Sequence, residues 1–224
     1  MLRKLGVVLS GKKANLNGLF LEICELKECI KSLSIRVESE AKWDLAGAAK
    51  LPNCLESLCI SGIKGKLPDW VKDLSCLAKI TLCDVYLKED DLVILGTLGR
   101  LIYLRFNYRS FDETTITFRE GQFSNLIDLV IEDAKLTSVI FDSGTAPKLS
   151  KIIWSFKNMD TLLGVQNLQS LKCLELNRGT CRPNGLKDLQ RDMPKKVRLT
   201  INPPEDDQGT EGVGTATITT LTPH

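Results

Sequence analysis

The stretch Leu126-Ile127-Asp128-Leu129-Val130-Ile131 contains the pattern that decides the fold. An apolar residue is followed by two variable residues, a second apolar residue, one variable residue and a third apolar residue. The pattern returns at 149–154 as Leu-Ser-Lys-Ile-Ile-Trp. Working outward in both directions gives nine copies, with central residues 22 to 28 residues apart. These central residues are Leu5, Leu33, Leu58, Ile80, Leu104, Leu129, Ile152, Leu174 and Leu199.

The three pattern positions are apolar in almost every copy. They hold 26 apolar residues out of 27, and the single exception is Lys196. Alternate residues of a strand point to opposite faces, so the second and third apolar residues of a copy share one face. One short strand cannot bury that face by itself, and the copies must therefore stack. The sequence predicts an α/β leucine-rich-repeat solenoid, a horseshoe with a concave parallel β-sheet and an irregular or helical convex side.

The segments between the copies carry weaker signals. Apolar residues three and four apart predict a helix over Leu16 to Ile30, and an acidic first turn predicts another over Glu89 to Leu98. The run at 67–71 should form a turn whose Trp70 packs on the convex side. Trp154 occupies an inward strand position and is expected in the core. The alanine-rich insertion at 38–53 has no predicted path.

The repeats define one domain. We expect residues 1–202 to form the leucine-rich-repeat domain, with about nine repeats. Pro203 and Pro204 lack amide donors and should end strand pairing. The Gly, Thr, Asp and Glu residues that follow predict a disordered C-terminal tail over 203–224.

Composition excludes several classes of function. The charges nearly balance, with 30 Lys and Arg against 28 Asp and Glu, so we expect no nucleic-acid or membrane partner. The single histidine is His224, which argues against a catalytic triad or a histidine-ligated metal. No phosphate-binding G-x-x-x-x-G-K-[ST] loop occurs. The chain is therefore expected to be no enzyme and to use no cofactor and no metal.

The eight cysteines indicate a cellular compartment. They lack C-x-x-C spacing, and most lie within apolar runs such as the one that ends at Cys24. Reduced, structural cysteines in a cytoplasmic protein are the expected reading.

Four stretches carry a family resemblance: Leu-Arg-Lys-Leu-Gly at 2–6, Ile-Lys-Ser-Leu-Ser-Ile at 30–35, Leu-Pro-Asp-Trp-Val at 67–71 and Phe-Ser-Asn-Leu-Ile-Asp-Leu at 123–129. They resemble the C-terminal leucine-rich-repeat region of plant intracellular immune receptors of the coiled-coil, nucleotide-binding type, as found in cereals. The resemblance implies a module that senses a pathogen effector protein. It also implies that the module helps to hold the receptor's own nucleotide-binding domain, outside this chain, inactive.

Two features depart from the resemblance. The nucleotide-binding loop is missing from this sequence, so the switch itself must lie elsewhere. The regular Asn or Cys ladder of many leucine-rich repeats is missing too. Other residues stand five positions after the centres, namely Ile63, Val85, Ala134 and Gly179.

The outward positions of the concave sheet are the residues just before, just after and three after each centre. The three middle strands combine an aromatic residue, an arginine, two acids and two aliphatics, a mixture typical of protein-binding surfaces. The N-terminal strands instead present mainly small polar residues. The alternative is that the aliphatics are ordinary strand formers and that the charges solvate the face. The candidate protein-binding residues are Tyr103, Arg105, Asn107, Asp128, Val130, Glu132, Lys151, Ile153 and Ser155.

A second function class stays open from the repeat alone. The chain could be a leucine-rich-repeat adaptor, for instance the substrate-recognition half of a ubiquitin ligase. The two classes differ in what precedes Met1, because a receptor carries a nucleotide-binding domain there and an adaptor carries an F-box or a similar segment. Both bind protein.

Overall fold

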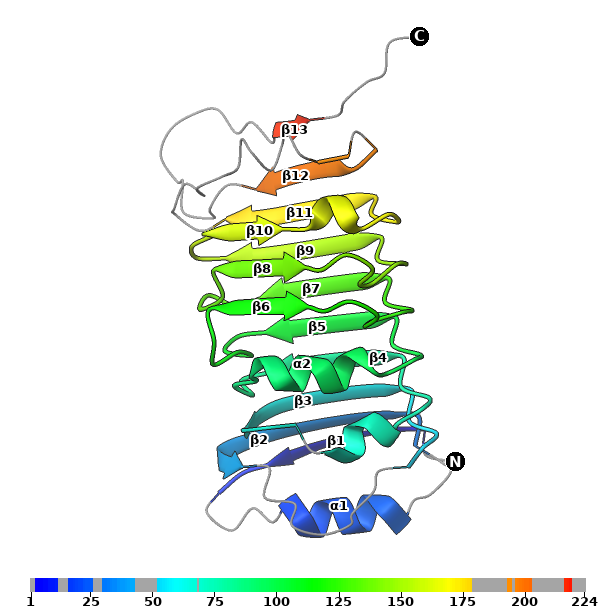
Figure 1. The fold of residues 1–224 in the computed structure, drawn as a ribbon. Helices are drawn as coiled ribbons and strands as arrows, with labels where there is room; N and C mark the ends of the chain where they lie inside the picture. Colours follow the sequence, from blue (N-terminus) through cyan, green and yellow to red (C-terminus); the bar gives the residue numbers. More distant parts are fainter. Residues whose placement is uncertain are drawn as a thin grey trace.

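Ten strands form one long sheet, which is parallel except at its last strand (Figure 1). The computed structural model describes residues 3–11, 16–25, 30–42, 52–67, 69–178, 193–194, 196–202 and 216–218. Each repeat contributes one strand to this sheet, and that strand is hydrogen-bonded to the strands of the adjacent repeats. The strands in sheet order are β1 (Lys4–Leu9), β2 (Ser32–Lys42), β3 (Ser57–Lys64), β4 (Lys79–Cys83), β5 (Tyr103–Asn107), β7 (Asp128–Glu132), β9 (Lys151–Phe156), β11 (Cys173–Arg178), β12 (Arg198–Asn202) and β13 (Ala216–Ile218).

The register confirms the predicted repeat. Leu104 lies opposite Ile80 on one side and Leu129 on the other, and the row continues through all nine central residues. The third apolar position forms a parallel row, in which Phe106 lies between Leu82 and Ile131. From β2 to β11 the residues of both rows are buried. One face of the sheet is therefore buried against the core.

The convex side holds a second sheet that we did not predict. Strands β6 (Thr115–Phe118), β8 (Ser138–Phe141) and β10 (Thr161–Leu163) pair in parallel, with β8 in the middle. Figure 1 shows them in front of the main sheet. Apolar residues alternate along β6, and Phe118 stacks on Phe141 with ring centroids 4.9 Å apart. The prediction of an irregular or helical convex side is therefore incomplete. These short connections suit a strand with alternating apolar residues better than a helix.

The helices lie on the same side as this second sheet. Helix α1 (Leu16–Glu25) falls within the predicted helix, whose residues 26–29 lie outside the described part of the chain. Helix α2 (Glu89–Gly96) begins where expected and ends two residues before Leu98. Trp70 lies in the 3-10 helix η1 (Asp69–Asp73) and packs against Phe20, as the convex placement predicted. Trp154 is buried in the core. A second 3-10 helix, η2 (Val165–Asn167), follows β10.

The insertion at 38–53 begins inside strand β2. Arg36 pairs with Ser61, but the next register pair joins Ala41 to Ile63, so the extra residues of β2 form a bulge. Gly62 has a positive φ of 79°, and a Cβ there would lie 2.0 Å from the Val37 carbonyl oxygen. Glycine is therefore required where the bulge crosses β3. Residues 43–51 lie outside the described part of the chain.

The predicted tail is described at one short segment. Ala216–Ile218 forms β13, which pairs antiparallel with β12. These three residues differ from the expected disorder. The prediction for the remainder of 203–224 falls outside the described residues.

Two buried aspartates bind backbone amides of neighbouring repeats. Asp91 is 1% exposed, and its Oδ1 accepts a hydrogen bond of 2.7 Å from the Leu67 amide. Its Oδ2 accepts a second bond of 2.8 Å from the Lys88 amide. Burial raises the pKa of Asp91, while the two amide hydrogen bonds act in the opposite direction because they stabilise the carboxylate. Asp133 does the same two repeats further on, where it accepts from the Phe111 amide at 3.0 Å. These carboxylates link repeats that lack an asparagine ladder.

Replacing Asp91 by alanine should lower the free energy of unfolding by about 2 kcal/mol or more, because the buried Leu67 amide and the partly buried Lys88 amide lose their acceptor. Asp91→Asn should cost less, since its amide oxygen still accepts one of the two bonds. Urea-induced unfolding measures both changes. The exposed neighbour gives the control, because Asp90→Ala should change stability by less than about 0.5 kcal/mol. Equal effects at 90 and 91 would show that the inter-repeat bonds contribute nothing.

Candidate protein-binding surface

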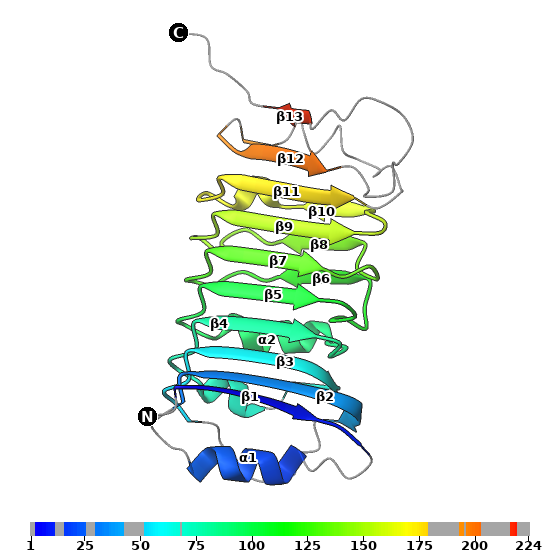
Figure 2. The same cartoon turned by 180° about the vertical axis from the view of Figure 1, so that it is seen from behind.

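The outward side chains of β5, β7 and β9 form three rows on the face of the sheet opposite the second layer. In Figure 2 the helices and the second sheet lie behind this face. The register places Tyr103 beside Asp128 and continues that row to Lys151, as the sequence predicted. Neighbouring strands lie about 4.8 Å apart, so these side chains share one surface. We call this surface the concave patch, and its role stays a prediction. The other two rows are Arg105, Val130 and Ile153, and then Asn107, Glu132 and Ser155.

Val130 offers less surface than its position suggests. Its exposed fraction is 8%, although its neighbours in the same row, Arg105 and Ile153, are half-buried and Lys151 is exposed. A partner would therefore contact the residues around Val130 rather than Val130 itself.

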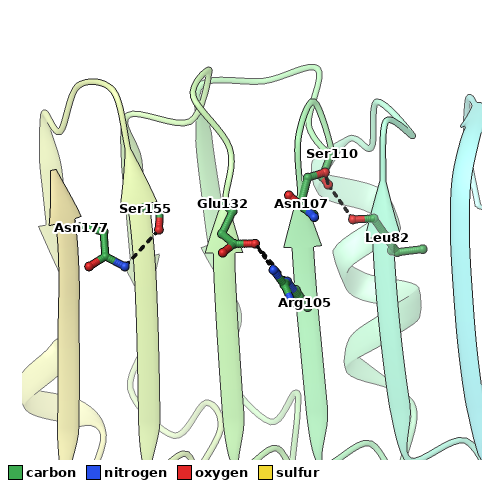
Figure 3. Close-up of polar contacts among 7 residues, drawn as sticks. All are labelled: Leu82, Arg105, Asn107, Ser110, Glu132, Ser155 and Asn177. Atoms are coloured by element: carbon green, nitrogen blue, oxygen red, sulfur yellow. Dashed lines mark hydrogen bonds and ion pairs between the residues drawn. The ribbon is translucent and has the colours of Figure 1, made fainter. Parts of the chain in front are cut away.

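Arg105 is bound to a neighbour within the patch. Its Nε and Nη2 both donate to Oε2 of Glu132, at 3.0 and 2.5 Å, as Figure 3 shows. The hydrogen bond to Glu132 raises the pKa of the Arg105 guanidinium. The two side chains are 37% and 31% exposed, so the pair is partly shielded from water. The sequence analysis placed both residues on this face but did not pair them. They are diagonal in the register, a distance that long side chains bridge.

A line of polar side chains continues the third row beyond the patch. Asn177 donates to the Ser155 hydroxyl at 3.2 Å (Figure 3). Asn202 donates to Oδ1 of Asn177 and, at 3.2 Å, to Glu175. These residues were missed as candidates, although they stand at the same repeat position as Asn107 and Ser155. That shared position was the available signal.

A group of partly or fully exposed side chains lies next to the patch, at the carboxyl ends of β3, β4 and β5. We call it the aromatic corner, and it comprises Lys64, Tyr86, Tyr108 and Arg109. The Lys64 ammonium lies 5.3 Å from the Tyr86 ring centre, and Arg109 lies 5.0 Å from the ring of Tyr108, which is 56% exposed. Two tyrosines in predicted loops were the only sign of this corner in the sequence.

The backbone of the aromatic corner is strained. Tyr86, Tyr108 and Arg109 have positive φ angles of 56°, 30° and 51°, which cost energy for residues with large side chains. The surrounding structure fixes them. The buried Ser110 hydroxyl lies within hydrogen-bonding distance of the Leu82 and Asn107 carbonyl oxygens, at 2.9 and 2.6 Å (Figure 3). Within the corner the Tyr86 amide donates to the Arg109 carbonyl oxygen at 3.2 Å, and the Tyr108 amide donates to the carbonyl oxygen of Glu132 at 2.8 Å.

Two searches give negative results within the described residues. No group of three or more His, Cys, Asp or Glu side chains there is arranged to hold a metal ion. No helix in that part of the chain has the length and apolar character needed to span a bilayer.

Comparison with known proteins places this geometry in context. A family model described as a leucine-rich repeat region matches residues 1–205. The disease resistance protein RPM1 of Arabidopsis thaliana is 30% identical over 125 residues, which cover 54% of this chain and 13% of that protein. The matched part of the chain thus spans a small fraction of that relative's length.

The Arg105–Glu132 pair should contribute a measurable coupling energy. A double-mutant cycle with Arg105→Ala, Glu132→Ala and the double variant is expected to give about 0.5 to 1 kcal/mol from urea unfolding, falling with added salt. The more exposed pair of Arg119 and Glu89, which lie 2.9 Å apart, serves as the control and should couple less. A coupling no larger than that of the control would mean that both residues are free to bind a partner.

Proposed function

The chain belongs to the leucine-rich repeat region family, and from that premise we propose that it is the protein-binding module of an intracellular plant disease-resistance receptor. The similarity to a disease resistance protein supports this assignment. The proposed receptor is of the coiled-coil, nucleotide-binding type, as in cereals. Residues 1–202 form its leucine-rich-repeat domain, and a nucleotide-binding domain lies outside this chain.

The observation that carries the proposal is the rigid concave patch. Tyrosine and arginine are the residues most enriched among the few that dominate binding energy at protein interfaces. Here Tyr103 and Arg105 project from a strand whose alternate residues, Leu104 and Phe106, are buried. Because the core fixes the strand, little conformational freedom is lost on binding. The patch therefore suits recognition of another folded protein.

We assign two partners to this module. A pathogen effector protein is sensed at the concave patch, and contact with the receptor's own nucleotide-binding domain contributes to autoinhibition. The module acts by binding rather than by catalysis, and it requires no cofactor. A cytoplasmic location is supported by the thiols of Cys59, Cys76, Cys83 and Cys173, which form no disulfide with a described residue. Three of them, Cys59, Cys83 and Cys173, lie on the main sheet.

Tyr103→Ala should weaken effector binding by at least about 1 to 2 kcal/mol, because it removes an aromatic anchor without touching the core. The chain would serve as bait in a two-hybrid screen of effectors from a cereal pathogen, and calorimetry would compare the variants on the effector recovered. Lys79 occupies the same row one strand away, so Lys79→Ala is the matched control and should bind normally. Leu104→Ala should instead lower stability by about 2 to 5 kcal/mol through a core cavity.

Two results would contradict the proposal. The patch is the wrong site if Tyr103→Ala binds normally while substitutions on the convex turns abolish binding. The receptor assignment is wrong if the coding sequence upstream of Met1 encodes an F-box rather than a nucleotide-binding domain, which would make the chain a ubiquitin-ligase adaptor.

A further inference from the structure

A hollow of about 570 Å³ opens at the edge where the later strands begin. Its lining comes from the residues just before β9, β11 and β12, together with Ile127 just before β7. The volume lies in the range of about 300 to 1,000 Å³ that is typical of ligand sites. Tyr103, Arg105 and the aromatic corner contribute nothing to the lining. The hollow is therefore a separate feature from the site proposed above.

The hollow is strongly cationic. Lys148, Lys172 and Lys196 line it and are all exposed, and its lining residues include no acid. Lys148 donates to the neutral side chain of Asn125 at 2.6 Å, and Lys196 donates to the Gln169 carbonyl. None of the three lysines forms an ion pair with a described residue. Three positive charges thus surround one hollow, and no carboxylate among the described residues pairs with them.

Lys196 links this hollow to the repeat pattern. It is the one pattern position, out of 27, that is not apolar. In the two preceding repeats the same position holds Leu149 and Leu171, which are buried completely. An apolar residue at 196 would have continued that row, whereas lysine places a third charge at the rim. The break in the repeat therefore coincides with the cationic hollow.

An exposed aliphatic side chain completes the hollow. Ile127 is 40% exposed, although it precedes a strand whose central residue is fully buried. Exposed single aliphatics are common, but this one stands beside three unpaired cations. The lining contains neither arginine nor an aromatic ring, the groups that favour nucleic acids through bidentate bonding and base stacking. The chemistry thus combines positive charge with a small apolar contact.

We propose that this hollow binds an acidic peptide segment of a protein partner, with its carboxylates on Lys148, Lys172 and Lys196 and an aliphatic side chain against Ile127. Charge complementarity selects such a segment and attracts it over distances of about 10 Å. This binding surface is independent of the concave patch, and it does not require the proposed receptor function. Failure of either proposal therefore leaves the other intact.

The test uses the full chain and a fluorescein-labelled peptide in which glutamate alternates with leucine. Fluorescence anisotropy should show saturable binding that weakens with salt. The double variant Lys172→Glu/Lys196→Glu should weaken it about tenfold or more, because two attractive charges become repulsive. Lys157→Glu reverses one charge at the opposite end of β9 and should alter affinity less than about twofold. Circular dichroism checks that each variant is folded.

The apolar contact has its own matched pair. Ile127→Ser should weaken binding, whereas Ile102→Ser, at the same repeat position and with a similar exposure of 37%, should not. A peptide with glutamine in place of glutamate should fail to bind. Three results would overturn the proposal: no saturable binding, equal losses for Lys157→Glu and the double variant, or equally tight binding of a single-stranded oligonucleotide or free phosphate. The last result would identify a general anion site.

Discussion

The structure depends on burial of two apolar rows that run across the main sheet. Strand residues alternate between faces, so a strand that slipped by one residue would expose its whole apolar set. Leu104 and Leu129 of the first row, like Phe106 and Ile131 of the second, are completely buried. Losing one such side chain costs about 2 to 5 kcal/mol, so a slip across several strands would exceed the stability of a typical domain. Burial of these rows therefore fixes which outward residues become neighbours.

Hydrogen bonds between repeats position the turns, whereas the apolar rows position the strands. Asp91 and Asp133 bind amides of the preceding repeat, and Ser110 lies within hydrogen-bonding distance of a carbonyl of the previous strand. These groups lie at the turns, where the apolar pattern gives no information on backbone direction. Backbone hydrogen bonds from the Tyr86 amide to Arg109 and from the Tyr108 amide to Glu132 join the same turns. Both tyrosines have left-handed conformations there, which bulky residues otherwise avoid. Rigid turns in this way extend the ordered surface beyond the edge of the sheet.

The extent to which the sequence predicts this structure follows from the same physics. The nine centres and their shared row were predictable, because a period of apolar residues reports directly on burial. The convex sheet was not, since a stretch such as the one from Thr115 to Phe118 is too short to distinguish a strand from a turn. The burial of Val130 and the pairing of Arg105 with Glu132 were not predictable either. Both depend on how side chains of neighbouring strands lie against one another. Lys196 was visible in the sequence as an exception to the repeat. The cationic hollow that it lines became apparent only when the structure placed the three lysines together.

The central claim is that the buried centres of successive repeats lie in one row. Methyl nuclear Overhauser measurements on selectively labelled Leu and Ile residues test it directly. The strongest inter-repeat contacts of Leu129 should be with Leu104 and Ile152, its partners in the register. If Leu104 instead made its strongest contact with Ile131, the strands would be shifted by two residues. The rows of the concave patch would then not exist as described.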